Sequence, residues 1–218
     1  MIVPLFPLPN VVLFPKTPVP LYVFEEKYRT MIREAIEGNK ELIIALLKPG
    51  LESGHSGISA VHPVACLGRI ETYEELEDGK YNIVVIGVQR VRIIREVQHA
   101  PYQMVEVESI EDPEYGALNE DLMVNHNQLG ELFAKFTELA TGANQHALDL
   151  MPQLDFESLV NMVAMTLNLA IEQKQALLEI DDPSLRCDVL VPILEQQLET
   201  LEIVRRFEHL KPENPHFN

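Results

Sequence analysis

Three apolar, β-rich runs follow one another in the range Val64–Glu96, which reads VACLGRIETYEELEDGKYNIVVIGVQRVRIIRE. In the first run apolar residues alternate with polar ones, and Asp78-Gly79 separates it from the second, which is a strong hairpin signal. Tyr81–Ile86 is apolar on both faces, as expected of a central strand. Residues 87–90 link the second run to the third. This stretch predicts a small antiparallel sheet around which the rest of the chain must pack.

The flanking segments extend this sheet. Residues 1–24 contain six prolines, which break the segment into short strand pieces because proline cannot donate a ladder hydrogen bond. Residues 25–37 have helical periodicity, and Gly38-Asn39 is expected to end that helix in a left-handed cap. Residues 42–47 and 104–110 read as further strands. Several short strands and one helix predict a partly closed, mainly antiparallel barrel.

Helical patterns take over after the polar boundary at residues 111–116. They cover residues 118–140, a helix capped by Asp155, a short helix at 172–180 and a last helix that begins at Pro183. Pro192 is expected to kink or restart that last helix. The sequence thus predicts the α+β class, with a β-barrel domain over residues 1–112 and an all-α helical bundle over residues 113–218.

Charge and apolar content limit the partners and the location. The formal charge is −17, and residues 111–218 hold 6 Lys/Arg against 20 Asp/Glu. Nucleic-acid binding needs clustered positive charge, so this half argues against such a partner and favours a solvated helical surface. No apolar run approaches ~20 residues, so no membrane span is expected. Cys66 and Cys187 make no disulfide framework, and the N-terminal prolines interrupt any signal peptide, so we expect a cytoplasmic protein.

Residues 50–60, GLESGHSGISA, form a glycine-rich loop of the kind that often carries function. Within it, His55 and Ser56 resemble part of the nucleophile elbow G-x-S-x-G, but Ile58 stands where the last glycine belongs. A strand–turn–helix setting is also missing. A small hydrolase that uses Ser56 or His55 therefore stays an alternative and not the main prediction.

Metal and phosphate chemistry find little support. His55, His62 and Cys66 fit no usual zinc spacing and lack an apparent fourth ligand. Gly79-Lys80 is followed by Tyr81 and belongs to no phosphate-binding loop. We predict no catalytic residue, no metal and no cofactor.

Three stretches carry a resemblance to a known family. They read PLFPLPNVVLFPKTPVPLYVFEEKYRTMI, LGRIETYEELEDGKYNIVVIGVQRVRI and KQALLEIDDPSLRCDVL, and together they cover nearly the whole chain. In content and order they resemble the Lon protease amino-terminal (substrate-binding) domain, especially its stand-alone form.

That resemblance implies a PUA-like pseudo-barrel followed by a helical bundle. In full Lon proteases this region helps to recognise unfolded or tagged polypeptides and supports oligomer assembly, with ATPase and Ser-Lys peptidase domains downstream. Neither domain is expected in this chain. The resemblance therefore implies a non-catalytic module that binds unfolded or tagged polypeptides, or an adaptor whose partner is an ATP-dependent protease.

The family motif Gly-x-x-Arg-x-x-Ile corresponds to Gly87, Arg90 and Ile93. We expect structural roles, with Gly87 supplying a bend and Arg90 satisfying carbonyls at the turn with its planar fork of donors. The binding residues are not identified by the sequence. We expect them away from Val64–Glu96, in a groove on the barrel or between the domains, with loop 50–60 as a candidate gate.

Two further alternatives come from related folds. A PUA-like protein could bind RNA, although the charge of −17 argues against it. A small-molecule pocket occurs in other Lon-like domains such as that of cereblon, but the absence of tryptophan from this chain leaves the aromatic cage found there without a counterpart.

Overall fold

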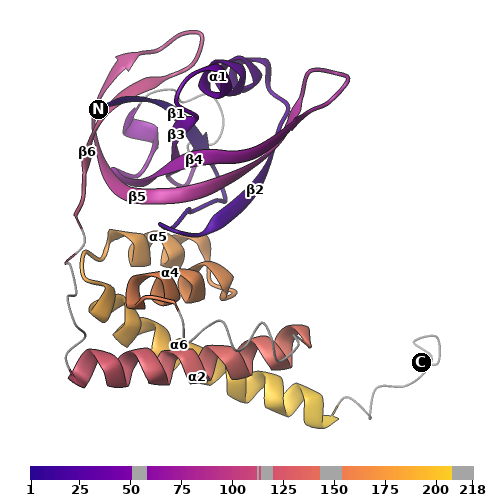
Figure 1. Ribbon diagram of the computed structural model, residues 1–218, viewed down its shortest axis with the longest axis vertical. Helices are drawn as coiled ribbons and strands as arrows, with labels where there is room; N and C mark the ends of the chain where they lie inside the picture. The colour runs from indigo at the N-terminus through magenta and orange to yellow at the C-terminus, as the bar shows by residue number, and fades with distance from the viewer. Residues whose placement is uncertain (51–57, 112, 114–119, 143–153, 208–218) are drawn as a thin grey trace. The chain divides into compact units, whose positions relative to one another are not determined.

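The computed structural model describes residues 1–50, 58–111, 113, 120–142 and 154–207 (Figure 1). The chain divides into two compact units, and each is discontinuous in sequence: Met1–Glu114 with Ala164–Asp182, and Tyr115–Val163 with Pro183–Asn218. The first contains all six described strands and the second is helical. The predicted α+β class is confirmed. The division of the chain at residue 112 stays a prediction.

A six-stranded sheet organises the first unit. Its elements are β1 (Ile2–Leu8), β2 (Pro18–Val23), α1 (Glu26–Glu37), β3 (Glu41–Leu46), a 3-10 turn (Ile58–Ala60), β4 (Val64–Glu75), β5 (Tyr81–Gln98), β6 (Met104–Ser109) and α5 (Ile171–Glu179). The strand order is β2-β5-β4-β3-β1-β6, and β6 also pairs with β5. Because β6 joins both β1 and β5, the sheet closes on itself into a barrel. The β1–β3 pair is parallel and the other pairs are antiparallel, so the sheet is mainly antiparallel, as the sequence predicted.

Both faces of this sheet are buried over most of its area. One core lies under α1, where Met31 and Ile32 pack with side chains such as Leu42. The other fills the closed part of the barrel with residues that include Val91 and Val105. Neighbouring residues of a strand point to opposite faces, so β3 and the first half of β4 contribute to both cores and read as continuous apolar runs.

The second and third apolar runs of the sequence form one strand. β5 is 18 residues long and passes through the link at 87–90 without ending. Its first half pairs with β2, its second half pairs with β6, and β4 runs along both. The register with β4 shifts between Leu67 and Gly68, which face Gln89 and Gly87, so Val88 is the extra residue of a bulge. The link is therefore a bend within a strand and not a connection between two strands.

Gly87 occupies this bend because another part of the backbone lies against it. A Cβ added there would sit 2.0 Å from the carbonyl oxygen of Phe14, closer than any real contact. The Gly87 amide donates to the Thr17 carbonyl at 3.0 Å, and the Lys16 amide donates to the Gly87 carbonyl at 2.8 Å. Glycine is required here by close backbone approach, since its φ is not in the positive range.

α1 is fixed by contacts with two hairpins of the barrel (Figure 1). Arg29 Nη1 donates to the Asp78 carbonyl at 3.0 Å in the β4–β5 turn. The Tyr102 hydroxyl donates to the Glu34 carboxylate from the β5–β6 connection. The predicted left-handed cap after this helix is wrong in detail: Gly38 has φ −98°, and the left-handed residue is Lys40 with φ 63°.

The helices of the second unit are α2 (Glu120–Thr141), most of α4 (Phe156–Thr166) and α6 (Pro183–Phe207). α2 contacts α6, and their buried apolar residues include Leu129, Phe133, Leu190, Leu194 and Leu198. As predicted, Asp155 caps α4, because its Oδ1 accepts from the Ser158 amide at 2.9 Å. α6 continues through Pro192, so the proline does not restart the helix.

Candidate functional site

The family motif on β5 contacts the chain's own backbone. Arg90 is 1% exposed, and its Nη1 donates to the Leu178 carbonyl at 3.0 Å and to Asp181 Oδ1 at 3.1 Å. Its Nη2 donates to the Asp181 carbonyl at 3.2 Å. The guanidinium thereby ties the barrel to the end of α5. Gln175 makes a second tie, from its Nε2 to the Val64 carbonyl at 3.0 Å.

Ile93 completes the motif, and its side chain is 8% exposed in the core inside the barrel. Gly87, Arg90 and Ile93 thus contact neighbouring backbone or core side chains of the first unit. The purely structural role that the sequence suggested for all three stays a prediction.

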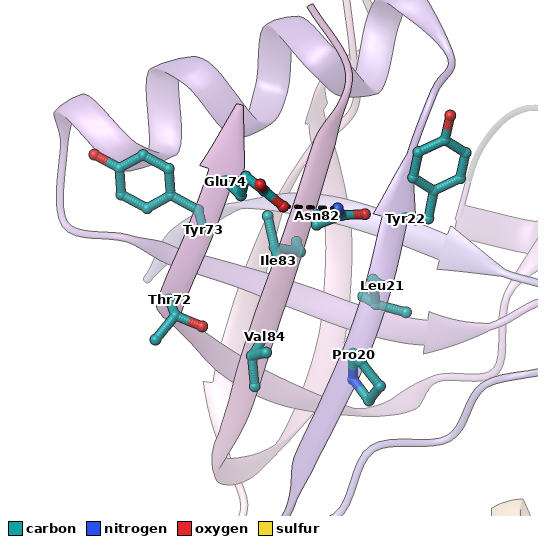
Figure 2. A pocket seen from close by; sticks show the side chains of 9 residues that line it. All are labelled: Pro20, Leu21, Tyr22, Thr72, Tyr73, Glu74, Asn82, Ile83 and Val84. Atoms are coloured by element: carbon teal, nitrogen blue, oxygen red, sulfur yellow. Dashed lines mark hydrogen bonds between the residues drawn. The ribbon is translucent and has the colours of Figure 1, made fainter. Parts of the chain in front are cut away.

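An open hollow lies on the outer face of three strands of the barrel, and Figure 2 shows it from close by. Its volume is about 460 Å³. β2, β5 and β4 supply its lining, which consists of Pro20, Leu21, Tyr22, Thr72, Tyr73, Glu74, Asn82, Ile83 and Val84. We call this surface the β2–β5–β4 hollow.

Strand register explains how these side chains come together. Tyr22 lies opposite Asn82, which in turn lies opposite Glu74, and these three make one row across the strands. Pro20, Val84 and Thr72 make a second row, two residues along each strand. Opposed residues of antiparallel strands point to the same face, so both rows face outward.

Two half-exposed tyrosines lie on the strands that border the hollow, but only Tyr22 shares its open face. Tyr22 is 53% exposed and lies in the row with Asn82 and Glu74. Tyr73 is 49% exposed and lies opposite Ile83, so its side chain points to the other face of the sheet. The exposed ring of Phe24 stacks on Tyr22 with 6.0 Å between ring centroids. Large aromatic side chains with this exposure are strong contributors to binding energy in protein interfaces.

Glu74 is the one charged residue among the nine that line the hollow. Its Oε2 accepts a hydrogen bond from Asn82 Nδ2 at 3.0 Å, which orients the carboxylate toward the middle strand, β5. Two lysines lie outside the lining, and each ammonium is 6.0 Å from a ring centroid: Lys40 over Tyr73 and Lys80 over Tyr22.

The charge of Lys80 is balanced within its own hairpin. Its Nζ lies 2.5 Å from Asp78 Oδ2. This hydrogen bond is the main reason why the pKa of Lys80 is raised and that of Asp78 is lowered. The hollow therefore presents apolar and aromatic surface together with one oriented carboxylate.

β2 borders the hollow and pairs with β5 on one side only among the described residues. Thr17 accepts from Gly87, so by alternation Val19, Leu21 and Val23 direct their backbone groups toward β5. The backbone groups of the alternate residues, Pro18, Pro20 and Tyr22, point to the open edge. Because proline has no N–H, Tyr22 is the one donor of β2 along this edge.

The residues considered for catalysis or metal binding are not assembled into a site by the described structure. His55 and Ser56, and most of the candidate gate at 50–60, lie outside the described residues. His62 Nδ1 is 3.2 Å from Glu179 Oε1, whereas Cys66 is fully buried in the core under α1. Within the described ranges, no group of three or more His, Cys, Asp or Glu residues could hold a metal ion.

None of the described helices is both long enough and apolar enough to cross a membrane.

The residues of the hollow were not predicted from the sequence. Six of the nine belong to Val64–Glu96, the stretch from which the binding surface was expected to be absent. A usable signal was present in β2, where Pro18, Pro20 and Tyr22 alternate with Val19, Leu21 and Val23. This is the pattern of an edge strand with one exposed face.

Comparisons with known proteins agree with this architecture. Two solved structures share the fold: the N-terminal domain of the Mycobacterium avium complex Lon protease (TM-score 0.71, 20% identity, 89% of this chain and 98% of that one) and a Lon N-terminal domain protein from Xanthomonas campestris (0.64, 22%, 88% and 98%). These likenesses concern the fold alone.

Sequence relatives include Lon protease 2 of Herpetosiphon aurantiacus, 31% identical over 92% of this chain, and Lon protease 1 of Bdellovibrio bacteriovorus, 30% identical over 93%. The chain spans about a quarter of the length of these curated relatives, 24% and 26%. The model of the ATP-dependent protease La (LON) substrate-binding domain matches residues 2–196. The chain therefore belongs to the LON substrate-binding domain family.

Proposed function

We propose that this protein is a non-catalytic module that binds segments of unfolded or tagged polypeptides in the β2–β5–β4 hollow. Membership of a substrate-binding domain family supports the general role. The observation that carries the location is the half-exposed ring of Tyr22, stacked on the exposed ring of Phe24, beside an open hollow of about 460 Å³. Unfolded chains expose the apolar side chains that such a surface can cover.

Rigid aromatic side chains suit this task energetically. A tyrosine offers a large contact area at a low cost in conformational entropy, because it has few rotatable bonds. The neighbouring Pro20 is rigid as well. Burial of apolar area provides the driving force at roughly 25 cal/mol per Å², and it tolerates many sequences because it is non-directional.

Binding uses the face of the sheet more than its edge. An added strand needs alternating donors and acceptors, and the open edge of β2 has lost the donors of Pro18 and Pro20. Side chains of the bound segment therefore provide most of the affinity, and the bound segment need not adopt a regular strand.

The chain contains no tryptophan, which allows a direct test. A blocked, unstructured apolar peptide with a single tryptophan is titrated with the protein, and only the peptide fluoresces when tryptophan is excited selectively. We expect saturable binding that weakens in Tyr22→Ser. The matched control is Phe207→Ser, since Phe207 is also 53% exposed but lies on α6. Equal affinity of both variants and the native protein would contradict the proposed location.

We further propose that the protein acts in the cytoplasm as an adaptor for an ATP-dependent protease. The support is its likeness to proteins named Lon protease over about a quarter of their length. Crosslinked affinity capture from the native cytosol, with and without ATP, tests it. Recovery of an ATP-dependent protease supports an adaptor, whereas recovery of diverse unfolded clients alone supports chaperone-like binding.

We propose no role in RNA binding and no hydrolase activity. The net charge of −17 supports the first statement. Retention on RNA that falls steeply with added salt would contradict it. For the second, peptide or ester hydrolysis that is lost in Ser56→Ala would overturn the proposal.

A further inference from the structure

The lining of the hollow is apolar and aromatic except for a few polar groups, and one of these bears a charge. Such an arrangement is typical of selective binding sites, in which apolar walls give affinity and a few oriented polar groups give specificity. The charged group here is Glu74. The specificity of the hollow therefore depends on what a bound segment places against this carboxylate.

We propose that the hollow selects apolar polypeptide segments that carry a lysine or arginine, whose cation pairs with the Glu74 carboxylate. This inference rests on the proposed polypeptide-binding function and adds a substrate class to it. Tyr22, Asn82 and Glu74 form one row across the three strands. The hydrogen bond from Asn82 orients the Glu74 carboxylate within this row before a partner binds.

Desolvation makes the carboxylate selective. Glu74 is exposed in the free protein and is hydrated there. A purely apolar segment that covered it would remove water without replacing the lost hydrogen bonds, at a free-energy cost. A segment with a basic side chain replaces that water with a charge-assisted hydrogen bond. The desolvation cost therefore weakens the binding of purely apolar segments more than the binding of basic ones.

The surrounding charge favours the same partner. Residues 71–80, which comprise the end of β4 and the turn before β5, contain five carboxylates and one lysine. That lysine, Lys80, is paired with Asp78 at 2.5 Å. The negative potential of the hairpin therefore attracts a basic segment, and this attraction weakens as salt increases.

The Tyr22 ring offers a second favourable contact for a cation. The ammonium group of Lys80 already lies 6.0 Å from the centroid of Tyr22, at the outer limit of cation–π attraction. A basic side chain that reached Glu74 would pass beside the Tyr22 ring, because both residues lie in one row on the same face. Its aliphatic stem would lie on the apolar lining while its charged end met the carboxylate.

Two blocked peptides test the inference. Each has the same apolar sequence with a single tryptophan, and they differ in one position, which is lysine in one and glutamine in the other. Both are titrated by fluorescence with the native protein, Glu74→Gln and Glu108→Gln. Glu108→Gln is the matched control, because Glu108 is an exposed carboxylate on β6 and its removal changes the net charge equally.

We expect the lysine peptide to bind the native protein about five- to tenfold more tightly than the glutamine peptide. The ratio should fall to about one in Glu74→Gln and persist in Glu108→Gln. In Glu74→Lys the preference should reverse toward a third peptide with glutamate at the variable position. These results together support the inference.

The outcomes separate this inference from the proposed function. If both peptides bind the native protein equally, and Tyr22→Ser weakens both, the polypeptide-binding hollow stands and the selection for a cation is wrong. A ratio that is unchanged in Glu74→Gln also overturns the selection. If neither peptide binds, the proposed function itself fails. Near-ultraviolet circular dichroism of each variant checks that the fold is intact.

Discussion

The two halves of β5 perform different tasks. In the second half, Gly87 touches the backbone of Phe14, and Arg90 donates hydrogen bonds to the end of α5. In the first half, Asn82 and Val84 face the open hollow. Close packing permits one residue type at a buried backbone contact, whereas an exposed face tolerates many. The motif Gly87, Arg90 and Ile93 therefore lies in the closely packed half of the strand, whereas the side chains of the hollow lie on its exposed half.

The largest expected effect is a loss of stability on substitution of Gly87, in the closely packed second half of β5. Gly87→Ala places a Cβ 2.0 Å from the Phe14 carbonyl oxygen, and neither backbone segment can move away without breaking the Gly87–Thr17 hydrogen bond. We expect a loss of about 4 kcal/mol or more in the free energy of unfolding of the barrel. Urea denaturation with hydrogen exchange of the strand amides measures it.

The control for that change is a glycine with room around it. A Cβ at Gly130, within α2, would lie 3.7 Å from Leu159 Cδ2, which is an ordinary contact. Gly130→Ala should therefore raise stability by up to about 1 kcal/mol, because alanine is the better helix former. A Gly87→Ala protein as stable as the native one would remove the argument from close packing.

A somewhat smaller effect is expected at Arg90. Arg90→Lys keeps the charge but loses the planar fork that reaches both the Leu178 and Asp181 carbonyls, so at least one buried acceptor loses its donor. We expect a loss of about 2–3 kcal/mol. A larger increase in hydrogen exchange over the native protein in α5 than in β3 would show that the variant loses the contact between Arg90 and the end of α5. Unchanged exchange in α5 would contradict the assignment.

A buried tyrosine of the first unit, Tyr102, predicts how stability changes at alkaline pH. Tyr102 is 7% exposed, and burial, together with the hydrogen bond to Glu34, raises its pKa from 10.0 to about 12. The native state therefore holds this proton more tightly than the unfolded state. The resulting stability is fully present below about pH 10 and is lost as the pH rises through 12.

Tyr102→Phe removes this titration. Between pH 10 and 12 the native protein should lose about 2 kcal/mol more unfolding free energy than the variant. Denaturation midpoints at several pH values in this window measure the difference. Parallel pH profiles for the two proteins would show that Tyr102 does not contribute.

The smallest expected effect belongs to the exposed half. Tyr22→Ser should leave the free energy of unfolding within about 0.5 kcal/mol of the native value, since the ring is half-exposed. Its effect should appear in binding, as an affinity for the apolar peptide lowered about fivefold. A Tyr22→Ser protein that is much less stable but binds the apolar peptide with unchanged affinity would contradict this assignment of stability to the second half of β5 and of binding to the first.

Local patterns in the sequence determined much of the fold. Period-two alternation and the Asp78-Gly79 turn predicted the β4–β5 hairpin, and period 3.6 predicted α1 within one residue at its start. These signals are local, because a strand or helix must turn its apolar side toward a core wherever that core lies. The resemblance of three stretches to one family then predicted membership of that family, which the comparisons confirmed.

Tertiary structure decided what depends on contacts between distant residues. Gly87 predicted a bend, but the sequence could not indicate why glycine is needed there, since the reason is the backbone of Phe14, more than 70 residues away. Nor could it bring Tyr22 into one row with Asn82 and Glu74, because strand register is set by pairing and not by local propensity. Sequence determined which elements form, and strand pairing decided which of their exposed side chains share a surface.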